Sequence, residues 1–380
     1  MSPRPASETF PLWLGALLGV AACGAPSDSF DDQEFGLAQL SESFVNGSDD
    51  RQEYFHLSQA AQRAALERFT VALMPQSTAE VVLSGDMASL PTWGELDELC
   101  PDEPFGDQPS AAFCSGVLVD WDLILTSGHC IAAIPLPELR VVFGYYYATP
   151  GELAVSRSDV FTVESVIESR RDPGSGGGER LDFAWLRLTR NVTPPHEPAR
   201  VHTRGDATII GASVISIGAG GGVPFKLDAG GKVQNTRPDF DDYFVADTDT
   251  SEGSSGGGIF DENLAVLGTL ARGAPDFQLS DGCWTTARQA DPAQALEEFT
   301  YAHRAVEALC EVQPDRYLCD EACEQPCTAE GLPLVIYDED GCSLRPGSGY
   351  SSRLTPSGWA VLSTSLCALL GRRRRRVNTR

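Results

Sequence analysis

The sequence from Asp249 to Gly258 reads DTSEGSSGGG, a run of small residues that leads directly into the apolar pair Ile259-Phe260. Small residues let a backbone turn tightly and bring its amide groups close to a ligand. A serine among glycines is a candidate nucleophile, and its own N–H and that of Gly253 would converge on an oxyanion. Such a run is also typical of a flexible Gly/Ser loop. The interpretation as an active site therefore requires a base and an orienting acid elsewhere in the chain.

The composition favours an exported, all-β protein that does not bind nucleic acid. The 380 residues include 37 Gly and 25 Pro, and the apolar residues fall in many short runs. The net charge of −26 argues against nucleic acid as a partner, because phosphate binding needs clustered Lys and Arg. Eleven cysteines are many for a reducing cytosol and indicate disulfides.

The N-terminus predicts export. Arg4 precedes an apolar segment, Phe10 to Ala22, that is too short to span a bilayer and is typical of a signal peptide. The sequence Val20-Ala21-Ala22-Cys23-Gly24 resembles the lipobox of bacterial lipoproteins, which implies cleavage before Cys23 and acylation of its thiol. An ordinary signal peptide with a chance cysteine is the alternative. We assign residues 1–22 to the signal peptide and 23–42 to a linker or pro-segment.

Short β-type runs alternate with turn signals from Ala79 onward, which predicts a sandwich or barrel. The predicted strands are Gly116–Val119, Leu123–Thr126, Arg140–Phe143, Val160–Val166, Phe183–Leu188 and Ser213–Ile217. Leu57–Leu66 has a helical spacing with Ser58 as its N-cap. The clearest helix is predicted over Ala293–Leu309, because Leu296, Phe299, Ala302, Val306 and Leu309 fall on one face.

The C-terminal part holds a cysteine-rich segment and a tail. Five cysteines lie between Cys310 and Cys342, and a core that small needs disulfides, so residues 311–352 are predicted to form a stalk or small module. In residues 353–380 an apolar stretch, Trp359–Leu370, precedes the basic run Arg372–Arg376. This arrangement resembles the sorting tails of some Gram-negative bacteria. A short membrane anchor is the alternative.

His129 is the candidate base. It follows two β-type runs and lies in Ser127-Gly128-His129-Cys130, with Cys114 placed to close the loop through a disulfide. A base beside a disulfide is held firmly, as proton transfer requires. Asp182 is the candidate acid, because it begins an apolar strand where a buried carboxylate needs a partner such as His129 Nδ1–H. Taken alone, an Asp that closes a turn before a strand is common.

The segments TSGHC, DFAWLRL and GSSGGG, in this order, resemble the three triad motifs of the chymotrypsin-like (trypsin-fold) serine peptidases. The resemblance covers roughly Val45 to Leu309 and implies two six-stranded antiparallel β-barrels with a C-terminal helix. It implies that His129 is the general base, Asp182 the orienting acid and Ser255 the nucleophile. The amides of Gly253 and Ser255 would form the oxyanion hole.

Two further segments, Val45–Arg51 and Ile217–Lys226, are similar to the mature start and a loop of bacterial glutamyl-endopeptidase-like (V8-like) enzymes. Ser254 supports this branch. Trypsin-type zymogens carry an Asp there, which pairs with the new N-terminal ammonium after cleavage, and Ser254 cannot form that ion pair.

The residues expected at the S1 pocket are Asp249, Thr250, Leu270 and Arg272. Asp249 stands six residues before Ser255, where trypsin-like enzymes hold a carboxylate that selects Arg or Lys. Some acid-specific bacterial relatives also carry Asp-Thr there, so a structural Asp is the alternative. Those relatives use a His where this chain has Leu270, while Arg272 leaves an acidic substrate open. The sequence favours a basic P1 residue.

The sequence thus predicts a trypsin-like serine protease domain over residues 43–310 that cleaves peptide bonds through an acyl-enzyme, without metal or cofactor. We expect the disulfide Cys114–Cys130, with Cys100 and Cys283 as candidates for another. The predicted protein is a monomer in the bacterial cell envelope, at the outer-membrane surface or outside the cell, and its partners are protein substrates and the membrane. The alternatives are a catalytically silent binding or adhesion module and an esterase.

Overall fold

The computed structural model describes residues 45–46, 48–172, 178–205, 208–273, 277–289, 297–320, 323, 325–329, 334–338 and 341–345. The predicted signal peptide, the lipidation site at Cys23, the linker up to residue 42 and the tail all lie outside the described residues. Within the described ranges, no helix is both long enough and apolar enough to cross a membrane.

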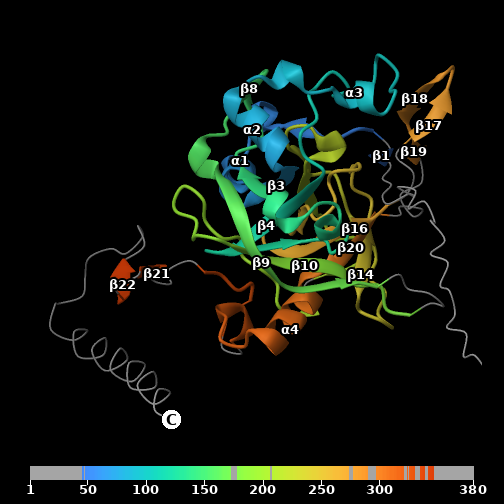
Figure 1. Ribbon diagram of the computed structural model, residues 1–380. Helices are drawn as coiled ribbons and strands as arrows, with labels where there is room; N and C mark the ends of the chain where they lie inside the picture. The colour runs from blue at the N-terminus through green and yellow to red at the C-terminus, as the bar shows by residue number, and fades with distance from the viewer. Residues whose placement is uncertain are drawn as a thin grey trace, which may run out of the picture. The chain divides into compact units, whose positions relative to one another are not determined.

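A closed barrel of six antiparallel strands forms the first half of the fold (Figure 1). Alternate side chains of its strand β4 belong to different apolar clusters, Val117 and Val119 to one and Leu118 to the other. Both faces are buried, which explains why this strand reads as a continuous apolar run. In barrel order the strands are β10 (Asp182–Leu188), β5 (Leu123–Thr126), β4 (Cys114–Asp120), β3 (Thr70–Pro75), β6 (Leu139–Phe143) and β9 (Val160–Arg171).

The second half is an eight-stranded antiparallel sheet whose order is open in the described residues. The prediction of closed six-stranded barrels is therefore confirmed for the first half and not for the second. The outer edge of β12 pairs with β2. The residues just before β11 contact the start of β13, since Val214 N donates to Gly231 O at 2.9 Å and Val233 N donates to Ala212 O at 3.0 Å. In sheet order the strands are β13 (Val233–Asn235), β14 (Tyr243–Ala246), β20 (Glu297–Tyr301), β16 (Val266–Arg272), β15 (Gly258–Phe260), β11 (Ile215–Gly218), β12 (Lys226–Asp228) and β2 (Gln52–Glu53).

Shorter elements surround the two sheets. The helices that precede β4 are α1 (Ala60–Arg68), α2 (Gln76–Ser84) and α3 (Trp93–Leu96). The short strand pairs are β1 (Val45–Asn46) with β19 (Arg288–Gln289), β7 (Tyr147–Thr149) with β8 (Glu152–Leu153), β17 (Phe277–Ser280) with β18 (Cys283–Thr286), and β21 (Leu334–Asp338) with β22 (Gly341–Arg345). A disulfide between Cys100 and Cys283 ties the segment before β4 to the β17–β18 hairpin.

The helix predicted over Ala293–Leu309 begins later than expected. Residues Glu297–Tyr301 form the strand β20, and the helix α4 runs from Ala302 to Val312. β20 is hydrogen-bonded on both edges, to β14 and to β16, and its residues Phe299 and Tyr301 are buried. These pairings override the helical spacing of residues 297–301, since a residue that is hydrogen-bonded to strands on both sides cannot take part in a helix.

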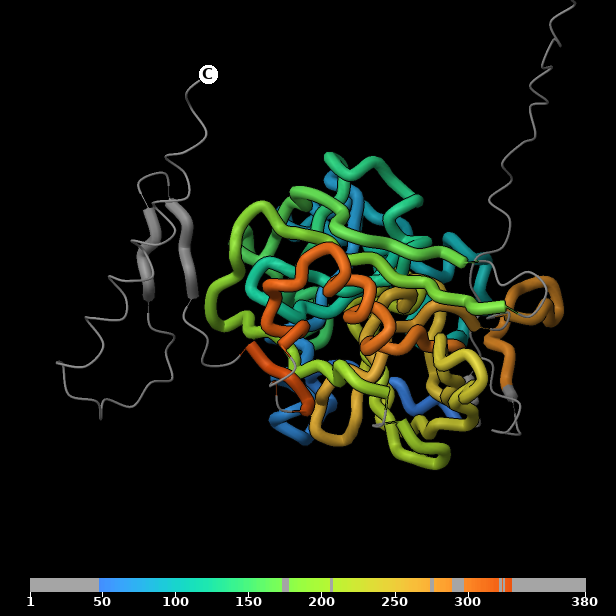
Figure 2. Tube along the Cα trace, turned by 90° about the horizontal axis from the view of Figure 1, so that it is seen from below, coloured from blue at the N-terminus to red at the C-terminus, as the bar shows by residue number. Residues whose placement is uncertain are grey.

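The first part of the cysteine-rich segment belongs to the folded body and does not form a separate stalk. α4 packs against β9, β10 and β16 (Figure 2). The disulfide Cys310–Cys319 joins its last turn to the segment that follows, and Cys323–Cys327 lies further along that segment. Arg316 Nη1 lies 2.7 Å from Asp120 Oδ2 and 2.5 Å from Asp122 Oδ1. Cys327 exchanges two backbone hydrogen bonds with Val201, at 2.8 and 2.9 Å.

Replacing Arg316 tests this docking. The change Arg316→Met removes the arginine that Asp120 and Asp122 share and leaves Asp122 with Arg187 at 3.7 Å. We expect the free energy of unfolding to fall by about 2 kcal/mol in urea denaturation. Arg68→Met is the matched control, since Arg68 pairs with Glu197 at 2.8 Å but its side chain is 46% exposed, and it should cost less than about 0.5 kcal/mol. Equal losses in the two variants would contradict the packing described for the segment after α4.

Candidate active site

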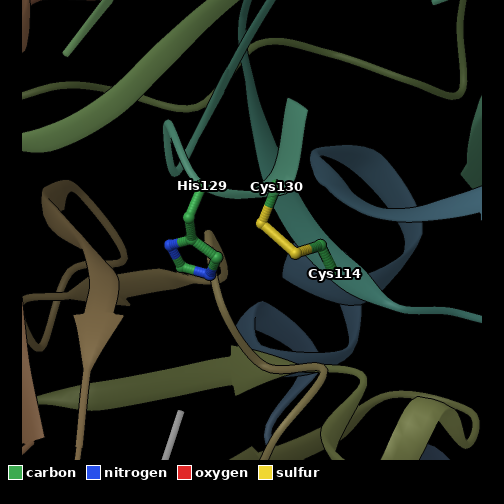
Figure 3. Close-up of side chains that lie close together, drawn as sticks. All are labelled: Cys114, His129 and Cys130. Atoms are coloured by element: carbon green, nitrogen blue, oxygen red, sulfur yellow. A yellow bond between two sulfur atoms is a disulfide. The ribbon is translucent and has the colours of Figure 1, made fainter. Parts of the chain in front are cut away.

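His129 lies in the turn that follows β5, and the turn is fixed on several sides. Cys130 is bonded to Cys114 at the start of β4, which ties this turn to the neighbouring strand (Figure 3). Ser127 Oγ donates to Leu270 O at 2.6 Å, which connects the turn to the second sheet. Gly128 is required by close packing, because a Cβ atom there would lie 2.1 Å from Arg170 O.

Both carboxylate oxygens of Asp182 bind His129. His129 Nδ1 lies 2.8 Å from Asp182 Oδ2, and the backbone N–H of His129 donates to Asp182 Oδ1 at 3.0 Å. Asp182 is only 4% exposed, and its own N–H donates to Thr300 Oγ1 at 3.2 Å. Carboxylate oxygens accept hydrogen bonds, so this contact favours the tautomer of His129 that carries its proton on Nδ1.

The run from Asp249 to Gly258 is a folded loop and not a flexible linker. Ser254 N donates to Ser251 O at 2.8 Å, Gly257 N donates to Ser254 O at 2.7 Å, and Gly256 N donates to Leu270 O at 2.8 Å. Gly256 has φ +77°, and a Cβ atom there would lie 2.1 Å from Thr126 Oγ1. The backbone at Gly256 therefore needs a glycine on both conformational and steric grounds.

The candidate nucleophile lies beside the disulfide that holds the base. Ser255 is 5% exposed; its carbonyl oxygen accepts from Ser115 N at 2.8 Å and lies 3.7 Å from Cys130 Sγ. Among the hydrogen bonds of the described residues, none joins Ser255 Oγ to His129, and none uses the amides of Gly253 or Ser255 as donors. These are the two amides that the sequence predicts for the oxyanion hole.

The four residues predicted for S1 do not share one environment. Asp249 and Thr250 line a small cavity of about 10 Å³, enough for roughly one water molecule. Leu270 is 4% exposed and belongs to the apolar core of the second sheet. Arg272 does not line that cavity either, since its guanidinium is bonded to Glu298 at 2.7 Å. Leu270 and Arg272 therefore do not line the cavity that Asp249 and Thr250 line, and their assignment to the S1 pocket stays a prediction.

The contacts of Asp249 favour a structural role over the selection of a basic substrate side chain. Asp249 Oδ2 accepts the backbone N–H of Asp50 at 2.7 Å, and Asp249 N donates to Asp228 Oδ2 at 2.8 Å. Asp249 is 4% exposed. Its carboxylate therefore binds the chain's own N-terminal segment, where the sequence suggested a substrate side chain.

Two cations that the sequence did not single out line the cavity beside Asp249. Arg51 is paired with Asp49 at 2.7 Å and donates to Ser251 Oγ at 3.0 Å. Lys226 donates to Gln108 Oε1 at 2.9 Å, and burial lowers the pKa of its ammonium to about 7. The positions of Arg51 and Lys226 depend on the pairing of β2 with β12, and residue patterns within a short stretch of sequence do not predict such a pairing.

The carboxylates of Asp50, Asp228 and Asp249 lie within 4.8 Å of one another. Burial raises the pKa of Asp228 to about 6. The oxygens of Asp228 accept the amides of Asp249 and Gly230, so each has a backbone partner. A cluster of acids without a further ligand signal is not a metal site, and we treat it as part of the loop scaffold.

Residues 114–268 match the family model of the trypsin-like peptidase domain. The matched stretch contains His129, Asp182 and Ser255. This part of the chain is similar to trypsin-like peptidases. No match was found among curated proteins.

Solved structures with a similar course of the chain include human heparin binding protein, at 16% identity and TM-score 0.42, covering 71% of this chain and 98% of that one. The inactive form of the protease Rv3671c from Mycobacterium tuberculosis is another, at 16% identity and TM-score 0.37, covering 66% of this chain and 91% of that one. Similarity at this level does not identify a function.

The raised pKa of Asp228 gives a pH-dependent prediction. Because this pKa is about 6 in the folded protein and 3.8 is the usual value, the stabilisation from its protonated form is present at low pH and is lost as the pH rises through about 6. We therefore expect the stability advantage of wild type over Asp228→Asn to shrink by about 2 kcal/mol between pH 4.5 and pH 7.5.

The measurement is chemical denaturation of both proteins over this range, with the exposed Asp102→Asn as a control for the loss of one negative charge. A constant difference between wild type and Asp228→Asn at all pH values would contradict the prediction.

Proposed function

We propose that this chain is a serine endopeptidase that hydrolyses peptide bonds through an acyl-enzyme. The observation that carries the proposal is the pair of hydrogen bonds from one buried carboxylate, Asp182, to the ring and the backbone of His129. Folding alone does not require a buried Asp–His pair beside a serine loop with two free amides. The match of residues 114–268 to the trypsin-like peptidase domain supports a peptidase.

The proposed roles follow the resemblance to the triad motifs, and the contacts between Asp182 and His129 support them. His129 Nε2 accepts the proton of Ser255 Oγ as this oxygen attacks the scissile carbonyl carbon. The imidazolium that forms is stabilised by Asp182, which stays ionised. The amides of Gly253 and Ser255 stabilise the negative oxygen of the tetrahedral intermediate. His129 then gives the proton to the leaving amine, and a water molecule repeats the sequence to release the acyl group.

The finer features remain part of the proposal. The segments Val45–Arg51 and Ile217–Lys226 support a place near the V8-like enzymes, and Ser254 supports activity without the ammonium–Asp switch of trypsin-type zymogens. Export rests on residues 1–22, and membrane attachment rests on Cys23 or on residues 353–380. A monomeric state is proposed with no further support. The absence of a hydrogen bond between Ser255 and His129 keeps a silent binding module as the second candidate.

Labelling tests the proposed nucleophile. A peptidyl organophosphonate should modify the wild-type protein at Ser255, because only an activated hydroxyl beside an oxyanion site reacts with it. The modified residue is found by mass spectrometry of peptides. Ser254→Ala is the matched control and should still be labelled, whereas Ser255→Ala should not. His129→Ala should lower kcat/KM on peptides by roughly 10⁴-fold. A folded wild-type protein that stays unlabelled would support the silent module, and hydrolysis of esters without peptides would support an esterase.

The role of Asp249 is tested by its effect on P1 preference. If Asp249 selected a basic P1 residue, Asp249→Asn would lower kcat/KM for Arg and Lys substrates by about 100-fold relative to other substrates. Because its carboxylate already binds Asp50 N, we expect instead a similar change for all P1 residues and a lower melting temperature. Profiling both proteins on one peptide library separates these results, and a selective loss of basic substrates would restore the interpretation from sequence.

A further inference from the structure

The sequence predicts that Arg272 contacts the substrate. The structure places its guanidinium beside Asp182, the acid of the Asp–His pair. Arg272 ends β16 and is paired across the sheet with Glu298 of β20. The pairing shifts register between Leu270 and Arg272, which is the signature of a β-bulge. A bulge redirects the side chain that follows it, and here Arg272 points toward the start of β10 in the barrel.

Three contacts hold the guanidinium of Arg272 in place. Nε donates to Glu298 Oε2 at 2.7 Å, Nη2 donates to Arg180 O at 2.7 Å, and the guanidinium carbon lies 5.6 Å from the centre of the Tyr243 ring. The planar fork of an arginine loses little freedom when several of its donors are fixed together. Arg272 is therefore held by its neighbours and not available as a flexible substrate-binding cation.

The third nitrogen of the Arg272 guanidinium, Nη1, faces the carboxylate of Asp182, which binds His129. Nη1 lies 3.8 Å from Asp182 Oδ2, the same oxygen that binds His129 Nδ1 at 2.8 Å. The side chain of Asp182 is 5% exposed and that of Arg272 is 24% exposed. The interaction thus takes place at the edge of the interior, where a cation is screened less than it is in bulk water.

We propose that Arg272 is a positioning residue: it fixes the carboxylate of Asp182, and through it the ring of His129, and it does not bind the substrate. The inference rests on the proposed peptidase function. Small errors in the placement of a reacting group are costly, since a displacement of about 1 Å can lower the rate about 100-fold. A cation beside Oδ2 restricts rotation of the Asp182 carboxylate about its Cβ–Cγ bond. This restraint adds to the one that the hydrogen bonds to His129 provide.

Arg180 provides a matched control within the same cluster. Its guanidinium binds the other oxygen of Glu298 at 2.9 Å and lies 5.5 Å from the centre of the Tyr243 ring, as that of Arg272 does. No ion pair between the side chains of Arg180 and Asp182 occurs among the described residues. Arg180→Gln and Arg272→Gln therefore remove the same charge from the same cluster, and only Arg272→Gln removes the contact with Asp182.

The first test is steady-state kinetics on peptides. We expect Arg272→Gln to lower kcat about 10- to 100-fold with KM unchanged, Arg180→Gln to stay within about threefold of wild type, and Arg272→Lys to recover part of the loss because the charge remains. Equal effects of the two Gln variants would overturn the proposal. A rise in KM confined to substrates with an acidic P1 residue, with kcat unchanged, would return Arg272 to the substrate pocket.

The second test does not depend on catalysis. The proton between His129 Nδ1 and Asp182 should give a low-field ¹H NMR signal, because it lies in a short, charge-assisted hydrogen bond. We expect this signal to move or broaden in Arg272→Gln and to be retained in Arg180→Gln. If wild type fails to cleave peptides or react with the phosphonate, the proposed function fails, while this comparison still decides the role of Arg272. An unchanged signal in Arg272→Gln would refute it.

Discussion

The contact between the carboxylate of Asp182 and His129 is the interaction on which the rest of the site depends. Asp182 begins β10 in the barrel, and His129 lies in the turn after β5. The backbone N–H of Asp182 donates to Thr300 Oγ1 of β20, and Arg272 Nη1 of β16 lies 3.8 Å from Asp182 Oδ2. A single buried acid thus contacts the barrel and the second sheet together. Such a group is stable only where its negative charge has several partners, so the arrangement of both sheets determines the position of His129.

The nucleophile loop is held at the same boundary by backbone groups. Ser115 of β4 donates its N–H to Ser255 O at 2.8 Å and its hydroxyl to Gly253 O at 2.9 Å. The second sheet adds a bond from Gly256 N to Leu270 O. Backbone and hydroxyl groups of the surrounding strands therefore fix the carbonyl oxygens of the loop that carries the proposed oxyanion hole.

Much of the local structure could be predicted from the sequence, because it depends on short-range patterns. The barrel strands that precede and follow His129 show the expected apolar runs, and the turn carrying it has the expected Gly and Cys. The boundary of β20 was missed, since Phe299 fits a helical and a strand period equally well and only the pairing with β14 and β16 decides. The direction of the Arg272 side chain could not be predicted for a similar reason, because it depends on a bulge in that pairing.

The least predictable part of the site is the contribution of the N-terminal segment. Arg51 and Asp50 are some 200 residues from the nucleophile loop, yet they bind Ser251 Oγ and Asp249 Oδ2. These contacts require β2 to pair with β12, a long-range event whose entropic cost is offset only in the complete fold. Oδ2 of Asp249 is bound by the backbone of this segment, so a substrate side chain would have to share the carboxylate with it. An Asp at this position can therefore stabilise the fold in one chain and select the substrate in another. Its hydrogen-bond partners in the folded protein decide between the two roles.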